Sequence, residues 1–188
     1  MLEIPTAPAV LTLPIAHLWD GSPPPRPELR ATLRLGATDD GIHVEASMPH
    51  QRPPRIPDAP PGARVDRLWE SDVVECFLVG ADGRYVELEL GAGGHYLLLA
   101  FAAPRVRAEG LREPALAVDW RADAVGWTSR CALPRGWLPE PLVAANAFAI
   151  GGGHFLAHHP VGGEAPDFHR PDRHPALRVP GWEQGVRE

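Results

Sequence analysis

The sequence predicts an all-β fold, an antiparallel β-sandwich that is jelly-roll-like or immunoglobulin-like. Several short runs alternate apolar and polar residues with a period of two, and turns rich in Gly or Pro separate them. The 23 prolines and 19 glycines are spread along the whole chain, and proline breaks helices and is excluded from ladder interiors. Because no run has the periodicity of an amphipathic helix, we expect about ten strands in one domain over residues 1–188.

The N-terminal third contains a predicted strand, a hairpin and a long loop. Residues 8–14 form the first expected strand. Residues 29–36 and 42–46 alternate in character on either side of Asp39-Asp40-Gly41, which is a strong hairpin turn. Residues 49–64 contain six prolines and cannot form a regular element. Long ordered loops of this kind are often functional.

The middle of the chain reads as a three-stranded meander. Its strands are expected at 73–79, 85–90 and 95–101, with glycine-containing turns between them. The run Trp137–Val143 holds one helical turn at most. The remaining expected strands are 115–121 and 126–133, turning near Asp123, then 142–150 and 154–158, turning at glycines 151–153, and a last one at 175–179.

Composition and charge exclude several classes of protein. The net charge is -6, which argues against nucleic-acid binding, and no apolar run approaches the roughly 20 residues that span a membrane. The N-terminus lacks a basic start and is interrupted by prolines, so we expect a cytoplasmic protein. All basic residues are arginine, which with many Ala, Gly and Pro indicates a GC-rich, bacterial genome. Cys76 and Cys131 read as buried free thiols, with a disulfide as the alternative.

Two separated signatures carry a resemblance to a known family. The first is Leu-Trp-Glu-Ser-Asp-Val-Val-Glu-Cys-Phe-Leu over residues 68–78, followed by a glycine turn and Tyr-Val-Glu-Leu over 85–88. The second is Asn-Ala-Phe-Ala-Ile over 146–150, which leads to Asp-Phe-His-Arg-Pro over 167–171. Together they resemble the family 9 carbohydrate-binding modules and the related DOMON-like domains, from about residue 5 to residue 180.

The resemblance implies a sandwich with a cleft in which two tryptophan rings hold a sugar ring between them. Trp69 corresponds to one of those tryptophans, Glu75 to a carboxylate of the site and Asn146 to a binding amide. Where the second tryptophan is expected, this chain has Phe155 and His158. The ligand implied is a mono- or oligosaccharide, and these five residues are the candidate ligand-binding set.

The chemistry of Trp69 and Glu75 suits a sugar ligand, although each has a structural alternative. An aromatic ring packs against the C–H face of a pyranose, and a carboxylate accepts hydrogen bonds from its hydroxyls. The even spacing of the two residues puts them on one face if the segment is extended. Trp69 is alternatively a core residue. Glu75 is alternatively a structural carboxylate, whose partner would come from Arg84, Arg105 or Arg170.

Glu87 and Glu89 share one face of the next expected strand with Tyr85. We expect that face to be solvated, as in many antiparallel sheets. The alternative is that both line the cleft beside Glu75 and form a carboxylate cluster able to bind calcium.

The histidines and Met48 suggest a metal site or a haem site as alternatives, but the expected site has no cofactor. His154 and His158 would share a face and suit a transition metal. Met48 with a histidine would suit haem, as in some DOMON-type domains. We expect neither.

Enzymatic motifs are not recognisable in the sequence. It has no Gly-x-Ser-x-Gly elbow, and the glycines at 151–153 join two strands rather than a strand and a helix. The function expected is therefore non-catalytic carbohydrate binding, with an interaction or structural domain of the same fold as the alternative.

Overall fold

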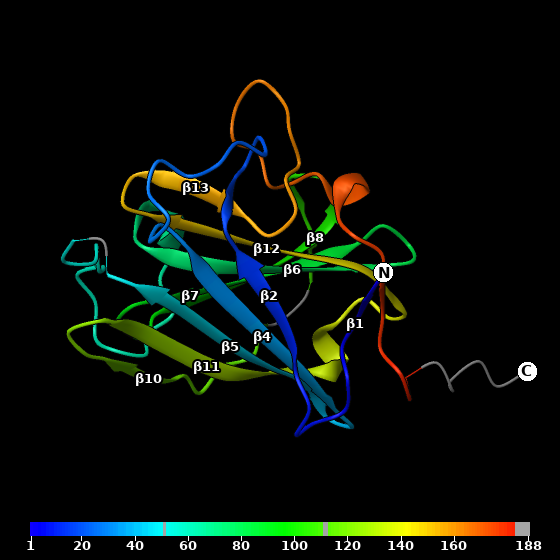
Figure 1. Cartoon of the computed structure of the whole chain (residues 1–188). Coiled ribbons are helices and arrows are strands. Elements are labelled where there is room, and N and C mark those ends of the chain that lie inside the picture. The colour runs from blue at the N-terminus through cyan, green and yellow to red at the C-terminus, as the bar shows by residue number, and fades with distance from the viewer. Residues whose placement is uncertain (51, 111–112, 183–188) are drawn as a thin grey trace, which may run out of the picture.

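Two antiparallel sheets packed face to face make up the body of the protein (Figure 1). The computed structural model describes residues 1–50, 52–110 and 113–182. Within them, the first sheet has five strands in the order β10-β11-β5-β4-β2. Their bounds are Asp119–Ala122, Gly126–Pro134, Gly41–Pro49, Ala31–Thr38 and Leu11–Ile15. This architecture confirms the predicted sandwich.

The second sheet, in the same described residues, has seven strands in the order β3-β13-β12-β6-β7-β8-β9. Strands β6, β7 and β8 form the predicted meander, and β12 pairs with the other side of β6. The bounds are His17–Leu18, His154–Ala157, Leu142–Gly151, Val73–Gly80, Tyr85–Gly91, Tyr96–Ala103 and Val106–Arg107.

Short elements complete the chain. Strands β1 (Leu2–Glu3) and β14 (Leu177–Arg178) form a small parallel pair that places the first residues of the chain beside residues 177–178. The three 3-10 helices of the described residues are η1 (Leu68–Glu70), η2 (Arg135–Trp137) and η3 (Pro171–Arg173). The helical turn expected within Trp137–Val143 lies earlier, at η2, and shares only Trp137 with the expected stretch.

Side chains of alternating positions fill the space between the sheets. Leu33 and Leu35 of β4 contribute from the first sheet, and Val74, Cys76 and Leu78 of β6 contribute from the second. Because side chains alternate across a strand, the intervening residues of β6 must point to the outer face of the seven-stranded sheet.

The outer face of the seven-stranded sheet is also covered, which makes β6 and β7 buried along their whole length. Phe77, Tyr85, Phe101 and Phe148 form a second apolar cluster there with Phe168 from the C-terminal segment. The solvated face expected for Tyr85, Glu87 and Glu89 is therefore wrong. Their exposed fractions are only 1%, 4% and 0%. Alternation shows which residues share a face, but not what covers that face.

Candidate functional site

A cavity of about 340 Å³ opens on the outer face of the seven-stranded sheet. Glu75 of β6 and Glu87 of β7 lie on the sheet itself. Trp69 of η1 and Phe155 of β13 contribute from two other elements, and residues 166–169 contribute from the C-terminal segment. Six strands and two loop segments thus meet at one site, which no short stretch of sequence could build.

Carboxyl groups form the polar part of this cavity. Glu75 faces Glu89 across the β6–β7 ladder, and Glu87 lies two residues before Glu89 on the same face. All three side chains are at most 4% exposed. Neither carboxyl oxygen of Glu89 has a hydrogen-bond partner among the described residues, and Oε2 of Glu87 has none either.

Burial raises the pKa of each of these carboxyl groups. It raises the pKa of Glu87 to about 7, although Arg107 and Arg105 act in the opposite direction. Burial also raises the pKa of Glu75 and of Glu89, and the neighbouring carboxylates add to the effect because like charges in a dry site repel. The group therefore holds protons near neutral pH, and a protonated carboxyl can donate as well as accept a hydrogen bond.

Two aromatic side chains remain exposed at the cavity. Trp69 is 38% exposed and Phe155 is 39% exposed. Phe155 is held by an edge-to-face contact with Phe168, with ring centroids 6.3 Å apart, and Phe168 stacks on Phe148 at 4.0 Å. Exposed apolar rings above buried polar groups are typical of a binding site for a small ligand.

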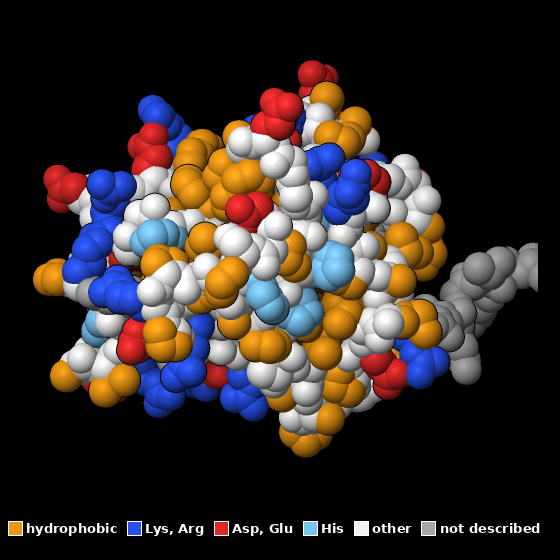
Figure 2. Space-filling view, turned by 45° about the horizontal axis from the view of Figure 1, so that its top comes forward, with side chains coloured by type: hydrophobic (Ala, Val, Ile, Leu, Met, Phe, Trp, Pro, Cys, Tyr) orange, Lys and Arg blue, Asp and Glu red, His pale blue; other side chains and the backbone are white. Residues whose placement is uncertain are grey.

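The proline-rich loop positions Trp69. The Asp72 side chain accepts a hydrogen bond from the Arg55 backbone N–H and forms an ion pair with Arg52. The Arg55 guanidinium donates to the backbone carbonyl of Glu70 at 3.0 Å. Figure 2 shows basic side chains gathered at the left of the molecule, on the side where Figure 1 draws this loop. The loop therefore holds the C-terminal end of η1.

Trp69 reaches the site by a route that differs from the predicted one. The even spacing of Trp69 and Glu75 assumed a continuous extended segment, but Trp69 lies on the 3-10 helix η1. Arg67 begins this turn with φ 60°, a left-handed conformation that is uncommon outside glycine. Both residues nevertheless line the same cavity.

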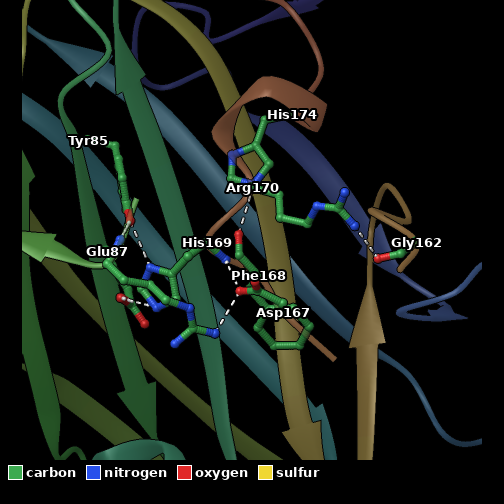
Figure 3. Close-up of polar contacts among 9 residues, drawn as sticks. Tyr85, Glu87, Gly162, Asp167, Phe168, His169, Arg170 and His174 are labelled. Carbon is green, nitrogen blue, oxygen red and sulfur yellow. Dashed lines mark hydrogen bonds and ion pairs between the residues drawn. The ribbon is translucent and has the colours of Figure 1, made fainter. Parts of the chain in front are cut away.

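The C-terminal segment closes one side of the cavity through a polar chain (Figure 3). The Tyr85 hydroxyl lies 2.8 Å from Nδ1 of His169, and Nε2 of His169 lies 3.7 Å from Oε2 of Glu87. Asp167 forms an ion pair with Arg105 at 2.8 Å and accepts a hydrogen bond from the His169 backbone N–H. Burial lowers the pKa of His169 to about 4, so its imidazole is neutral at pH 7.

Asn146 and His158, two of the five candidate ligand-binding residues, do not line the cavity. The Asn146 amide donates to the His159 carbonyl at 2.9 Å and accepts from the His159 backbone N–H at 3.1 Å. Nδ1 of His158 lies 2.9 Å from the Pro14 carbonyl oxygen of the other sheet. The structure gives both side chains roles in holding the chain, away from the space in which a ligand would lie.

Of the three arginines considered as partners of Glu75, one lines the cavity. This is Arg105. Arg84 forms an ion pair with Asp82, and Arg170 donates to the carbonyl oxygen of Gly162 at 2.8 Å. The structure therefore corrects the expectation for these two.

The residues considered for metal or haem have other surroundings. Met48 is 3% exposed in the core between the sheets. Across residues 1–50, 52–110 and 113–182, no group of three His, Cys, Asp or Glu side chains is arranged to hold a metal ion. Cys76 and Cys131 are both free and buried. In the same part of the chain, no helix has the length and apolar character needed to cross a membrane.

Sequence reasoning missed several residues of the cavity. Arg107 lies on a two-residue strand, which has no pattern that signals a site, and Asp167 belongs to the second family signature but was not proposed as a site residue. Glu87 was weighed as a cavity residue but assigned to a solvated face. The signal available in the sequence was the alternation of side chains, which puts Glu87 and Glu75 on the same face of the sheet when their two strands pair.

A second cavity, of about 410 Å³, lies over the five-stranded sheet. The two arginines that line it are paired with acids, Arg34 with Glu45 and Arg130 with Asp119. No Phe, Tyr or Trp side chain lines it. It therefore lacks the exposed Trp and Phe rings that mark the first cavity.

Comparison of the sequence with known proteins decides the family. The rat UPF0462 protein C4orf33 homolog is 30% identical over 167 residues, which cover 83% of this chain and 82% of the rat protein. The chain belongs to the UPF0462 protein C4orf33 family. The human member is 30% identical over 168 residues and the zebrafish member 27% identical over 169. No family model matches the sequence.

Solved structures share the fold at low sequence identity. A candidate carbohydrate-binding protein of Bacteroides uniformis has a TM-score of 0.64 at 16% identity, over 95% of this chain and 99% of that one. A family 9 carbohydrate-binding module of Caldicellulosiruptor kristjanssonii, solved with cellotriose, has a TM-score of 0.62 at 8% identity, over 95% and 92%. The same organism's module with glucose gives 0.62 at 10% identity, over 100% and 99%.

These comparisons confirm one part of the resemblance and correct two expectations. The fold is that of the family 9 carbohydrate-binding modules, but a likeness to DOMON domains is not supported. The expectation of a bacterial protein is wrong, because the matched relatives are from rat, human and zebrafish. A composition rich in Arg, Ala, Gly and Pro reflects codon usage and does not identify a lineage.

Proposed function

We propose that the protein binds a carbohydrate, without catalysis, in the cavity between Trp69 and Phe155. The observation that carries the proposal is the pairing of two exposed aromatic rings with buried carboxyl groups in one cavity of about 340 Å³. Aromatic rings pack on the C–H faces of a pyranose, and carboxyl groups bond its hydroxyls. The fold shared with modules solved with cellotriose and glucose supports the same ligand class.

Each group has a distinct role in this proposal. Trp69 and Phe155 exclude water and hold the ring, while Glu75 and Glu87 take the hydroxyls that point to the sheet. Glu75 and Glu87 have raised pKa values, so their carboxyl groups can accept a bond from one hydroxyl and donate to another. The rim is built from a tryptophan and a phenylalanine, a less polar pair than two tryptophans, because phenylalanine offers no N–H donor.

The test is isothermal titration calorimetry with a panel of mono- and disaccharides, using the wild type, Trp69→Ala and Glu75→Leu, which removes both the donor and the acceptor of the carboxyl group. We expect both variants to lose at least about tenfold in affinity, equivalent to about 1.4 kcal/mol. Trp120→Ala is the matched control, since Trp120 is 39% exposed, close to the value for Trp69, and lies on β10 away from the cavity. It should bind like the wild type.

Two results would contradict the proposal. One is a folded wild-type protein that gives no heat of binding with any sugar at millimolar concentration, which would favour an interaction or structural role for the sandwich. The other is sugar binding that Trp120→Ala weakens as much as Trp69→Ala, which would place the site elsewhere.

A further inference from the structure

Two guanidinium groups line the cavity, and they differ in their partners. Arg105 forms an ion pair with Asp167, so its charge is already balanced. Arg107 forms no ion pair with a carboxylate of residues 1–50, 52–110 or 113–182. Arg107 thus brings to the cavity a positive charge that no ion pair among these residues holds, although it acts on Glu87 by lowering the pKa of that carboxyl group.

The surroundings of Arg107 hold its guanidinium in place and leave its donors free. Its Cζ lies over the Phe101 ring, 4.7 Å from the ring centroid. A guanidinium that stacks on an aromatic face is fixed by that contact, while its N–H donors remain at its edge. Such an edge matches the two oxygens of a carboxylate or phosphate in a bidentate contact. Arg107 is also exposed, so a ligand can reach it.

The carboxyl groups nearby do not cancel this charge as three ionised acids would. Glu75, Glu87 and Glu89 occupy adjacent positions of two paired strands and are buried. Buried like charges at such positions cannot all ionise, and the pKa of each is raised. The sheet side of the cavity thus carries less negative charge than fully ionised glutamates would give it. It suits the hydroxyl groups of a ligand better than an ammonium group.

We propose that the preferred ligand of this cavity is an anionic pyranose, whose carboxylate or phosphate is bound by Arg107. This inference rests on the proposed function, because it takes the sugar ring to lie between Trp69 and Phe155. The hydroxyls then face Glu75 and Glu87, and the acidic substituent faces the β8–β9 side of the cavity, where Arg107 lies. A uronic acid and a sugar phosphate both present anionic oxygens to the guanidinium, although the phosphate carries the larger negative charge at pH 7.

The experiment compares three ligands that share one ring and differ at carbon 6. D-glucose, D-glucuronate and D-glucose 6-phosphate are titrated calorimetrically into the wild type, Arg107→Gln and Arg121→Gln at pH 7. Arg121 is the control, since it is an exposed arginine of β10 that does not line this cavity. We expect the wild type and Arg121→Gln to bind at least one of the anions about tenfold more tightly than glucose. Arg107→Gln should lose this preference and bind the anions no more tightly than it binds glucose.

The possible outcomes separate this inference from the proposed function. If glucose binds as tightly as both anions, the inference is wrong and the proposed function stands. If D-glucosamine, added as a cationic probe, binds more tightly than the anions, the inference is also wrong. A preference for anions that survives in Arg107→Gln would overturn the role of Arg107. Failure of the folded protein to bind any of these sugars would overturn both proposals. Preference for glucuronate or for the phosphate would identify the anion.

Discussion

Tyr85 and His169, which are 84 residues apart in the sequence, meet through a contact of 2.8 Å between the Tyr85 hydroxyl and Nδ1 of His169. The Tyr85 oxygen also accepts a hydrogen bond from the Arg105 backbone N–H at 3.1 Å. With the Tyr85 proton donated to Nδ1, the proton of the neutral imidazole lies on Nε2 and faces Glu87. One side chain thus joins the sheet, the β8–β9 turn and the C-terminal segment around the cavity.

Tyr85→Phe is expected to destabilise the protein by about 1–2 kcal/mol. The substitution keeps the ring but removes the hydroxyl, which leaves the Arg105 N–H and Nδ1 of His169 without their partner. Urea denaturation followed by fluorescence measures the change. Tyr85 is 1% exposed, so water cannot readily replace the lost group. A variant as stable as the wild type would contradict this account.

The free energy of unfolding is expected to fall as the pH rises from 6.5 to 8. The Glu87 pKa is raised from 4.5 to about 7, and those of Glu75 and Glu89 are also raised, so the folded state binds more protons than the unfolded state in this range. His169 and His174, whose pKa values are lowered from 6.5 to about 4, act in the opposite direction, an effect that is large below pH 6.5 and fades as the pH rises above it.

Glu87→Gln should flatten this pH dependence. Removing the one titrating proton of Glu87 reduces the slope of the free energy of unfolding against pH by at most about 1.4 kcal/mol per pH unit. The measurement is urea denaturation of both proteins at pH 6.5, 7 and 8. A wild-type stability that rises over this range would show that these carboxyl groups are already ionised at pH 6.5, and a slope unchanged in Glu87→Gln would show that Glu87 does not titrate between pH 6.5 and 8.

Glu89→Met is expected to stabilise the protein at pH 8 by about 1–3 kcal/mol. Glu89 is 0% exposed, neither of its oxygens has a partner, and it does not line the cavity. An unbranched apolar side chain removes the cost of a buried carboxyl group without removing a hydrogen bond. The measurement is the free energy of unfolding, with Glu45→Met as control, because Glu45 forms an exposed ion pair with Arg34. Destabilisation in Glu89→Met alone would indicate that Glu89 has a partner in solution.

Gly41→Ala is expected to cost about 3 kcal/mol or more. Gly41 has φ +153°, and a Cβ there would lie 2.1 Å from the Leu133 carbonyl oxygen of the neighbouring strand. Backbone must move to relieve that contact, in the hairpin that fixes the register of β4 and β5. Gly136→Ala is the matched control, since its Cβ would meet nothing within 4 Å. Thermal denaturation of both variants tests the difference, and equal melting temperatures would contradict it.

Native thiols are expected to be unreactive toward a thiol reagent. Cys76 and Cys131 are free and buried, and burial raises the pKa of Cys131 to about 12. Because only the thiolate reacts quickly, colorimetric labelling at pH 8 should proceed only after unfolding in guanidinium, with two thiols per chain. Labelling of the native protein within minutes would show that the sheets open.

The sequence by itself determined the strands and the sandwich. The expected strands at 73–79 and 85–90 correspond to Val73–Gly80 and Tyr85–Gly91, because alternation and glycine turns act over a few residues. It also placed Trp69, Glu75 and Phe155, which line the cavity, through local motifs. The two-residue strands β1, β3 and β9 were not predicted, since two residues carry no periodicity.

Only the tertiary structure decided what lies over the seven-stranded sheet. Burial of Glu87 and Glu89, the position of Arg107 over Phe101 and the closure by His169 all depend on segments far apart in the chain. Alternation assigns a side chain to a face, but the dielectric surroundings of that face depend on which distant segments pack on it. For the same reason, Asn146 matches a binding amide of the family in sequence and His158 lies near the expected second tryptophan, while packing engages both side chains with backbone away from the cavity.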